Sequence, residues 1–396
     1  MKNITKYIFP LTMLASLIAA SLVGIFANGS FIESLKPLGD IFINLMFTLV
    51  VPLVFFTITS SIANMSKKMR LNKILTKTFI VFIITSAISA VVMLIPLLFI
   101  NPSNGINIQI SGETQEKISV LEQITKAITV EDFSQLFSKN HMLPLIIFSI
   151  LFGLSLRYID KDNKIGKGLE LLSKTTLRIV KIVMFYAPLG VFAYFANLIH
   201  SYGEEIISGY LTSLIIYIGA SIAYFLIFYS LYVYIAKGKN GVKLFYKNIF
   251  PSFTCSLATQ SSLASLPTNI ETAQEMQIDE NIHKVALPLG ATIHMEGSAM
   301  GSILKIFFLF SVFSIPITSP LTYISAIIIA IASGVVMSGI PGGGLIGEML
   351  IVSLYGFPPA AFTMIATIGW IIDAPATMLN VCGDLPSCML IEKKKS

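Results

Sequence analysis

Long apolar stretches with almost no charge are the feature that most constrains this sequence. Of its 396 residues, 55% are hydrophobic and only 12% are charged. Soluble domains carry about 25% charged residues, and a helix that crosses a bilayer needs about 20 apolar residues. Several stretches reach that length, so the chain cannot cover its surface with polar groups. We therefore expect an all-α membrane protein that crosses the lipid bilayer many times.

Six of the apolar stretches are typical of ordinary membrane spans. The first follows Lys2 and Lys6, as the core of a signal peptide does, but it is longer than such a core and further spans follow it. We interpret it as an uncleaved span. The six predicted spans are 8–28, 41–65, 78–101, 142–158, 179–199 and 207–236.

The charged residues between the spans predict the orientation of the chain. Lysines and arginines gather after the second, fourth and sixth spans, whereas the segment 102–140 and the gap after the fifth span are acidic. Basic loops face the cytoplasm, so we expect both termini on the cytoplasmic side of the cell (inner) membrane. This distribution accounts for the net charge of +6, and we expect no nucleic-acid partner.

The apolar material after residue 236 is too long for two plain spans. A cytoplasmic tail requires an even number of further crossings, so we expect two pieces that cross and two that enter the membrane and return. The four pieces are 248–275, 281–312, 320–356 and 358–391.

The first and third pieces are the predicted re-entrant hairpins. Residues 251–267 are dense in Ser and Thr, and residues 338–344 read SGIPGGG, which no continuous helix carries. The second and fourth pieces are predicted broken helices, with polar patches at 294–298 and 373–384. We therefore predict eight transmembrane helices plus two re-entrant hairpins, arranged as the inverted repeats of a secondary transporter.

Six ionisable residues fall inside these late apolar pieces. A charge at the bilayer centre costs about 2.5–3.5 kcal/mol on insertion scales, so such a residue indicates function unless it is paired. We expect function for Asp373, Asp384 and the pair His294 and Glu296. For Lys305 and Glu348, pairing with each other for structure alone is an equally good interpretation.

These residues describe a pocket for a zwitterion. The hydroxyl groups and free backbone N–H groups at the tip around Ser261 and Ser262 favour a carboxylate. Asp373 offers a negative charge for an ammonium group, and Asn380 lies two turns along the same helix face. Unpaired carbonyl and carboxylate oxygen atoms at Gly290, Asn380 and Asp384 describe a cage for a small hard cation.

Four motifs carry a resemblance to a known family. They are TQSSLASLP at 259–267, PLGATIHMEGS at 288–298, SGIPGGG at 338–344 and DAPATMLNVCGD at 373–384. The chain resembles the dicarboxylate/amino acid:cation symporter family, the glutamate-transporter homologues, over nearly its whole length. The resemblance implies a homotrimer in which a mobile transport domain carries solute past a rigid scaffold by an elevator movement.

The resemblance also implies a division of the chain and a set of site residues. Residues 1–77 and 102–206 form the scaffold and an extracellular loop, 78–101 and 207–391 form the transport domain, and 392–396 are a cytoplasmic tail. Ser261 and Ser262 receive the substrate carboxylate, and Asp373 holds the amine. The remaining implied substrate-pocket residues are Gln260, Ile340, Pro341, Gly342, Ala376, Thr377 and Asn380. The implied cation-site residues are Gly290, Thr292, Asn380 and Asp384, with Thr85 and Ser86 at another site.

One departure from the family concerns the substrate. Ala376 stands where members that carry acidic substrates have an arginine, and Gln260 stands where some members have another. A second substrate carboxylate without a partner is costly to desolvate, although Lys305 is a possible replacement. We therefore favour a neutral amino acid, with an acidic amino acid or dicarboxylate as the alternative.

A second departure concerns the coupling ion. His294 and Glu296 replace an asparagine and an aspartate of the family, and Phe82 replaces a tyrosine near a cation site. Hard cations prefer oxygen ligands, whereas histidine titrates near neutral pH, so His294 and Glu296 are candidates for proton coupling. Na⁺ and H⁺ both remain open, and we expect no other cofactor.

Two other classes of protein compete with a carrier. An intramembrane enzyme needs a metal motif or a nucleophile–base pair, and because HExxH is absent we expect no enzyme. A ligand-gated channel or nutrient sensor on the same fold is the stronger rival.

The pocket interpretation predicts the effect of removing the amine anchor. Asp373→Ala should abolish the rise in melting temperature that an amino acid gives in a thermal-shift screen, because the ammonium group loses its counter-ion. Asp132→Ala, in the acidic loop, is the control. An unchanged ligand-induced shift in the Asp373 variant would contradict the pocket.

Overall fold

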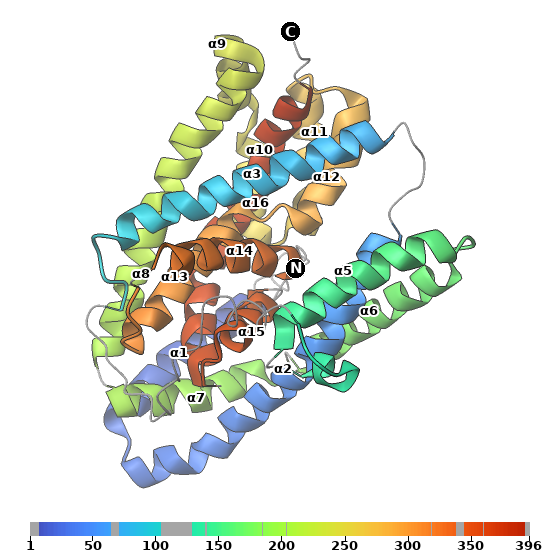
Figure 1. The fold of residues 1–396 in the computed structure, drawn as a ribbon. Coiled ribbons are helices and arrows are strands. Elements are labelled where there is room, and N and C mark those ends of the chain that lie inside the picture. Colours follow the sequence, from blue (N-terminus) through green and yellow to red (C-terminus); the bar gives the residue numbers. More distant parts are fainter. Residues whose placement is uncertain are drawn as a thin grey trace. The chain divides into compact units, whose positions relative to one another are not determined.

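The computed structural model describes residues 8–64, 71–103, 129–138, 141–183, 185–202, 204–317, 319–337, 344–358 and 360–392 (Figure 1). Within these ranges the regular structure is helical and no strand occurs. The predicted all-α class is confirmed.

The helices are α1 Ile8–Phe26, α2 Gly29–Ala63, α3 Leu71–Leu97, the 3₁₀ helix η2 Phe133–Phe137, α5 Met142–Ile159, α6 Lys164–Val183, α7 Ala187–Tyr202, α8 Glu204–Ala223, the π-helical segment η4 Tyr224–Tyr229, α9 Ser230–Asn248, α10 Phe250–Thr259, α11 Ser262–Glu275, α12 Glu280–Ile293, α13 Glu296–Val312, α14 Pro320–Met337, α15 Gly344–Tyr355 and α16 Ala360–Glu392.

The chain forms two compact units that alternate along the sequence. The first unit contains residues 1–67, 108–207 and 349–364, and the second contains residues 68–107, 208–348 and 365–396. The chain passes between the units inside α15 and again inside α16. The segment 349–364 therefore belongs to the first unit, although we expected it to continue with the late helices.

In the first unit, α2 is the central helix. It packs against α5, α6 and α7, and α1 packs against α7. Glycines make these approaches close, since a Cβ atom at Gly190 of α7 would meet the ring of Phe42 on α2. Phenylalanine rings of α2, η2 and α5 cluster around Phe55.

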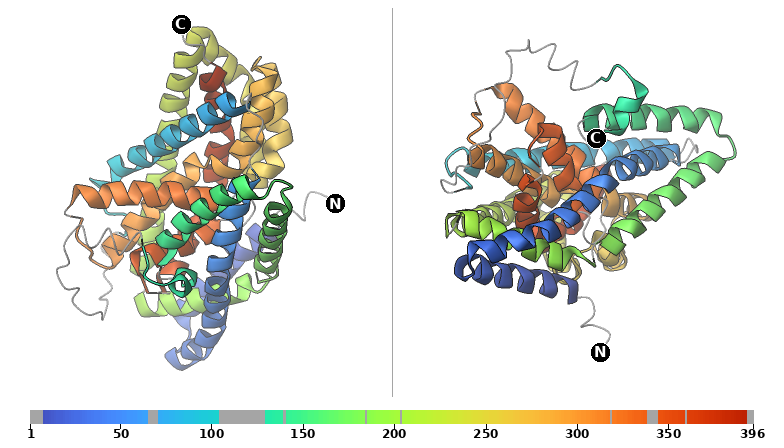
Figure 2. Two further views of the ribbon diagram at one scale, coloured as in Figure 1. Left: turned by 45° about the vertical axis from the view of Figure 1, so that its right-hand side comes forward. Right: turned by 90° about the horizontal axis from the view of Figure 1, so that it is seen from below.

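In the second unit, α3 packs across α12, α13 and α14. The arms α10 and α11 lie side by side in each view (Figures 1 and 2). Four helical stretches of the described residues are long and apolar enough to cross a membrane, and the bent pair of α6 and α7 makes a fifth if it is one span. The four are 74–97, 206–248, 280–312 and 361–392.

The first predicted hairpin is present as a helical hairpin. The chain reverses at Gln260, which has a left-handed backbone (φ 49°), and at Ser261, whose hydroxyl accepts a hydrogen bond from the N–H of Ala264 at the start of α11. A hydrogen bond of 2.8 Å from Ser252 to Thr272 joins the two arms. The predicted second hairpin falls on α14 and α15, and because its tip at 338–343 lies outside the described residues it stays a prediction.

The break predicted in the 281–312 piece is also confirmed. Helix α12 ends at Ile293 and α13 begins at Glu296. His294 and Met295 between them have non-helical backbone angles, with φ/ψ of −99°/93° and −122°/60°. His294 and Glu296 of the predicted polar patch therefore lie where two helix ends meet.

The prediction of a broken last helix was wrong. Helix α16 runs without interruption from Ala360 to Glu392, with Pro375 and Pro386 inside it. Polar side chains of this helix find partners on other elements, as shown below for Asn380 and Asp384. The backbone therefore does not need to unwind to satisfy them.

The predicted fifth span, 179–199, was also misplaced. Helix α6 ends at Val183 and α7 begins at Ala187, next to Pro188, which favours a first helical turn. The basic segment before Val183, taken as a loop, is an amphipathic helix. The second span was predicted to begin at residue 41, but α2 begins at Gly29, where Asn28 accepts a hydrogen bond from the N–H of Phe31.

Close packing of α13 on α16 predicts a stability effect. A Cβ atom at Gly297 would meet backbone atoms of Ala376, so Gly297→Ala should destabilise the protein by about 1–3 kcal/mol through overpacking. Thermal unfolding in detergent measures this as a lower midpoint. Gly219→Ala on α8 is the control, because nothing lies within 4 Å of its Cβ position. Equal midpoints for the two variants would contradict the close packing.

Candidate functional site

His294 lies at the centre of a buried polar cluster in the second unit. Its Nδ1 atom is 2.8 Å from Oδ1 of Asp384, and its Nε2 atom is 2.8 Å from Oγ1 of Thr85. The ring is fully buried and stacks on Phe82, with centroids 4.1 Å apart. The imidazole therefore joins residues that were implied for two different cation sites.

Helix α12 makes room for Asp384. A Cβ atom at Gly290 would meet the carboxylate of Asp384, so the absence of a side chain there lets α16 present this carboxylate to the helix break. The backbone carbonyl of Gly290, expected to be unpaired, instead accepts a hydrogen bond of 3.0 Å from the N–H of His294. That expectation was wrong because the last turn of α12 continues to the break.

Glu296 is fully buried and is held by two tyrosines. The hydroxyl of Tyr224 is 2.9 Å from Oε1, and the hydroxyl of Tyr229 is 2.8 Å from Oε2. The nearest atom of His294, Nε2, is 3.6 Å from Oε1. Glu296 and Asp384 thus approach the two nitrogens of one imidazole.

The Tyr229 hydroxyl has more hydrogen-bond partners than protons. The Tyr229 hydroxyl has a single proton, yet it lies 2.8 Å from Oε2 of Glu296 and 2.7 Å from the carbonyl oxygen of Leu379. A carbonyl oxygen only accepts. When Glu296 is protonated on Oε2, it donates to Tyr229 and Tyr229 donates to Leu379, so both contacts of the Tyr229 hydroxyl hold a proton. When Glu296 is ionised, one of these short oxygen contacts has none.

The remaining implied cation residues lie around this cluster. Thr85 also accepts a hydrogen bond from Tyr224 at its backbone carbonyl, and Ser86 is buried one residue further along α3. The hydroxyl of Ser89 donates to the backbone carbonyl of Glu296. Thr292 is half-buried, and its hydroxyl donates to the carbonyl of Leu289.

Asn380 caps the start of α13. Its Oδ1 atom accepts hydrogen bonds from the N–H groups of Gly297 and Ser298, at 2.9 and 3.3 Å, and its Nδ2 atom donates to the hydroxyl of Ser298. The first N–H groups of a helix have no partner within it. The side chain implied for substrate and cation contact therefore also fixes α13 to α16.

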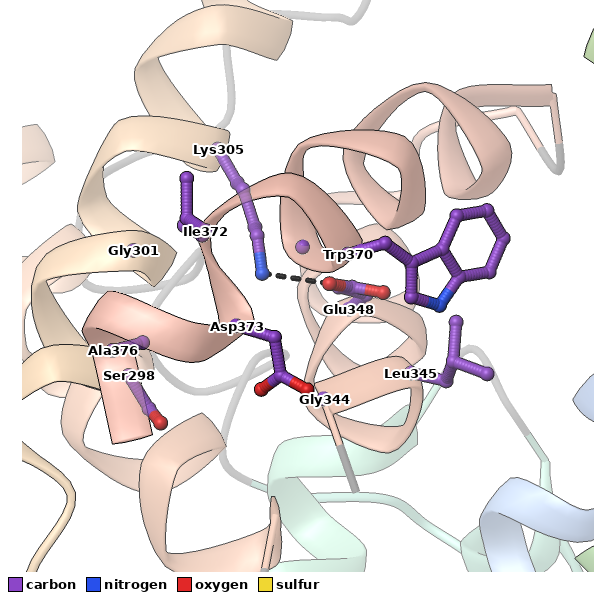
Figure 3. Close-up of a pocket in the computed structure, with 11 residues that line it drawn as sticks. Ser298, Gly301, Lys305, Gly344, Leu345, Glu348, Trp370, Ile372, Asp373 and Ala376 are labelled. Carbon is purple, nitrogen blue, oxygen red and sulfur yellow. Dashed lines mark hydrogen bonds and ion pairs between the residues drawn. The ribbon is translucent and has the colours of Figure 1, made fainter. Parts of the chain in front are cut away.

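A second cluster surrounds a small cavity of about 40 Å³ (Figure 3). Asp373 and Ala376 line it from α16, Lys305 from α13 and Glu348 from α15. The ammonium group of Lys305 is 2.6 Å from Oε1 of Glu348, so these two residues pair with each other, as one of the two interpretations held. The Asp373 carboxylate forms no hydrogen bond or ion pair with the other residues drawn in Figure 3, which leaves it available for an ammonium group.

The other implied substrate residues are not among the described residues lining this cavity. Gln260, Ser261 and Ser262 form the first hairpin tip, and the last two are almost fully buried. Thr377 is buried on α16. Ile340, Pro341 and Gly342 lie outside the described residues.

Sequence reasoning missed Tyr224 and Tyr229. Their signal was available, since both are tyrosines in an apolar span and they are five residues apart. The segment between them is π-helical, and a π-helix repeats at i→i+5. This local winding turns both hydroxyls toward Glu296.

Comparison with known proteins was consistent with the architecture. A model of the sodium:dicarboxylate symporter family matches residues 9–394. The chain belongs to this family. Two relatives are called proton/sodium-glutamate symport proteins: one from Geobacillus stearothermophilus is 26% identical, over 93% of this chain and 89% of the relative, and one from Bacillus caldotenax is 25% identical, over the same shares. The family consists of symporters, and membership together with the apolar helices makes the chain a multi-pass membrane protein of that class.

A proton on Oε2 of Glu296 would determine how substitutions at this residue behave. Glu296→Gln should unfold near the wild-type temperature, because its amide donates to Tyr229 and accepts from Tyr224 as a protonated carboxyl group does. Glu296→Leu should lose about 1–3 kcal/mol, because each of the two hydroxyls loses one of its hydrogen-bond contacts. Thermal unfolding at neutral pH compares them. If the Gln variant is as unstable as the Leu variant, Glu296 is ionised at rest.

Proposed function

We propose that the protein is a secondary active symporter that imports a small neutral amino acid together with protons. The observation that carries the proposal is the buried cluster of His294, Glu296 and Asp384. A proton on Glu296 lets both short contacts of the Tyr229 hydroxyl hold a proton. A proton-coupled carrier needs such a site inside the membrane, and intramembrane ionisable groups of this kind commonly form proton relays.

The cluster supports two protonation states of His294. With both ring nitrogens protonated, the ring donates to Asp384 and to Thr85, and the Thr85 hydroxyl donates to the carbonyl of Phe82 at 3.4 Å. With Nε2 unprotonated, the Thr85 hydroxyl donates to the ring instead. A proton can therefore enter or leave while every buried nitrogen keeps a partner.

Na⁺ is the alternative coupling ion. The names of the two relatives include both sodium and proton, and oxygen atoms of Asp384, Thr85 and Ser86 suit a hard cation. Here, however, the imidazole contacts two of the three, and its nitrogen atoms are poor ligands for sodium. We therefore place the proton first.

The state of Lys305 supports a neutral substrate. It is the cation in the cavity beside Ala376, and it is already paired with Glu348 at 2.6 Å. A substrate side-chain carboxylate would have to displace Glu348 and leave that buried carboxylate without its counter-ion, which is costly. An acidic amino acid or dicarboxylate, as the names of the relatives and of the family suggest, is the second candidate. Lys305 would bind its second carboxylate only if Glu348 were displaced.

The wider architecture belongs to the same proposal. We assign the first compact unit to a scaffold and the second to a transport domain that moves as an elevator within a homotrimer. Both termini would face the cytoplasm of the cell (inner) membrane. A ligand-gated channel or nutrient sensor on this fold would bind the same solutes without stoichiometric exchange.

The coupling ion is tested in proteoliposomes. A pH gradient, acidic outside and without sodium, should drive uptake of a labelled neutral amino acid, because protons bind the cluster from the acidic side. The direction should reverse when the gradient is reversed. Uptake that requires a sodium gradient and ignores the pH gradient would refute proton coupling. Current without solute accumulation would indicate a channel.

A double variant tests which residues determine the coupling ion. His294→Asn with Glu296→Asp recreates the Asn-Met-Asp sequence of the family, which replaces the imidazole by an amide oxygen and shortens the acid. We expect uptake to become sodium-dependent and to lose about tenfold or more of its response to the pH gradient, as expected when a proton-transfer group is removed. His200→Asn, at an exposed histidine of α7, is the control. An unchanged response to the pH gradient would exclude the cluster as the proton-coupling site.

A further inference from the structure

One face of helix α6 packs against the rest of the first unit. The buried residues on this face are Gly166, Leu169, Ser173, Thr176 and Val180. The hydroxyl of Ser173 is 2.9 Å from that of Thr57 on α2, and the Asn64 side chain donates to the carbonyl of Gly166 at 3.3 Å. These contacts determine which side chains α6 turns outward.

Basic side chains form one outward stripe along α6. The stripe consists of Lys167, Lys174, Arg178 and Lys181, all of them exposed. They follow one another at intervals of seven, four and three residues, which places them on one side of the helix. Lys174 pairs with Glu170, the only acidic residue of α6, at 2.6 Å. The other three form no ion pair with the described residues.

An apolar stripe lies directly beside the basic one. Its members are between 42% and 66% exposed, and they are Ile165, Leu171, Leu172, Ile179 and Ile182. With about 100° of rotation per residue, this stripe occupies the sector between the basic stripe and the buried face. Helix α6 therefore presents a cationic side and an apolar side next to each other, and both are exposed.

The length of the basic stripe restricts how α6 can lie in a bilayer. From Lys167 to Lys181 it runs about 21 Å along the axis, at about 1.5 Å per residue. In a helix along the membrane normal, part of this stripe would enter the hydrocarbon, where charges are costly. A helix along the surface brings all four basic groups to the headgroups. The axes of α6 and α7 meet at 59°, so α7 can cross the bilayer while α6 follows its surface.

The pairing of a cationic with an apolar stripe identifies the partner. Zwitterionic headgroups offer the basic groups no net counter-charge. A nucleic acid would neutralise them but leave the apolar stripe in water. A surface of anionic phospholipids satisfies both stripes, because phosphates meet the basic groups and acyl chains meet the apolar side chains. The segment after the fourth predicted span is expected to face the cytoplasm, where the leaflet carries anionic lipids.

We propose that α6 is an interfacial helix whose basic stripe binds the headgroups of anionic phospholipids, while its apolar stripe lies among their acyl chains. The ammonium and guanidinium groups donate charge-assisted hydrogen bonds to the phosphate oxygens. The inference depends on the position of the chain in a membrane and not on its solute or coupling ion.

Removing the unpaired charges tests the site. The full-length protein is purified in a neutral detergent and titrated with phosphatidylglycerol, and bound lipid is counted by native mass spectrometry. The triple variant Lys167→Gln, Arg178→Gln and Lys181→Gln should bind this lipid at least about tenfold more weakly than the unchanged protein, because each basic group near an anionic surface contributes about fivefold. Glutamine is a good helix former, so α6 is retained.

Two further variants serve as controls. Changing Lys239, Lys243 and Lys247 to Gln removes the same charge from exposed lysines of α9, and the affinity for phosphatidylglycerol should stay within about twofold. The charge-conserving variant Lys167→Arg, Arg178→Lys and Lys181→Arg should bind as the unchanged protein does. The melting temperature without added lipid checks that every variant is folded.

Three results would overturn the inference. The first is equal affinity of the α6 and α9 glutamine variants for phosphatidylglycerol. The second is equal affinity of the unchanged protein for phosphatidylglycerol and phosphatidylcholine. The third is a change of oligomeric state in the α6 variant with unchanged lipid binding, which would make this face a contact between copies of the chain. Lipid binding is measured without transport, so each of these results leaves the proposed symport untouched.

Discussion

The contact of His294 with Asp384 is the interaction around which the interior of the second unit is organised. Two helix ends meet at His294, and the imidazole links them to α3 through Thr85 and to α16 through Asp384. In a bilayer no water is available to satisfy such groups. The break between α12 and α13 is therefore stable only while these side chains satisfy one another. Gly290 and Gly383 are part of this condition, because a side chain at either position would collide with the carboxylate of Asp384 or of Glu296.

The second cluster follows a different physical rule. In the first cluster most buried polar groups have hydrogen-bond partners, whereas around Ala376 some buried polar atoms have none among the described residues. Lys305 satisfies half of Glu348, and Oε2 of Glu348 and Nε1 of Trp370 lack partners among the described residues. A protein that only needed stability would gain by filling this space with apolar side chains. The mismatch therefore lies on residues that line the same cavity as Asp373.

The two clusters share α13 and α16, which gives them a physical connection. Asn380 caps α13 between them, and Gly297 lets the two backbones come into close contact. A change in the protonation of Glu296 at the start of α13 therefore acts on a helix that also carries Lys305. Rigid elements shared by two sites are one way in which binding at one site alters the other.

Residue patterns predicted much of this molecule but not its finer geometry. The hairpin around Gln260 and the break at His294 were predictable, because dense hydroxyl residues and a polar patch are incompatible with a lipid-facing helix. The same reasoning failed for α16, where the polar residues Asn380 and Asp384 lie on an unbroken helix because other elements satisfy them. It also failed at α6, since a run of lysines that predicts a loop is equally compatible with one face of an amphipathic helix.

The sequence by itself determined that the protein lies in a lipid bilayer, that it is helical and which family it belongs to. These properties follow from the length of apolar stretches and from local motifs, which consist of consecutive residues. It also identified His294, Glu296, Lys305 and Glu348 as residues that need partners. Only the tertiary structure decided which residues those partners are. The tyrosines on Glu296 depend on a π-helical winding, and the link from His294 to Thr85 joins residues 209 positions apart. Such contacts arise from packing between distant segments, which no local pattern encodes.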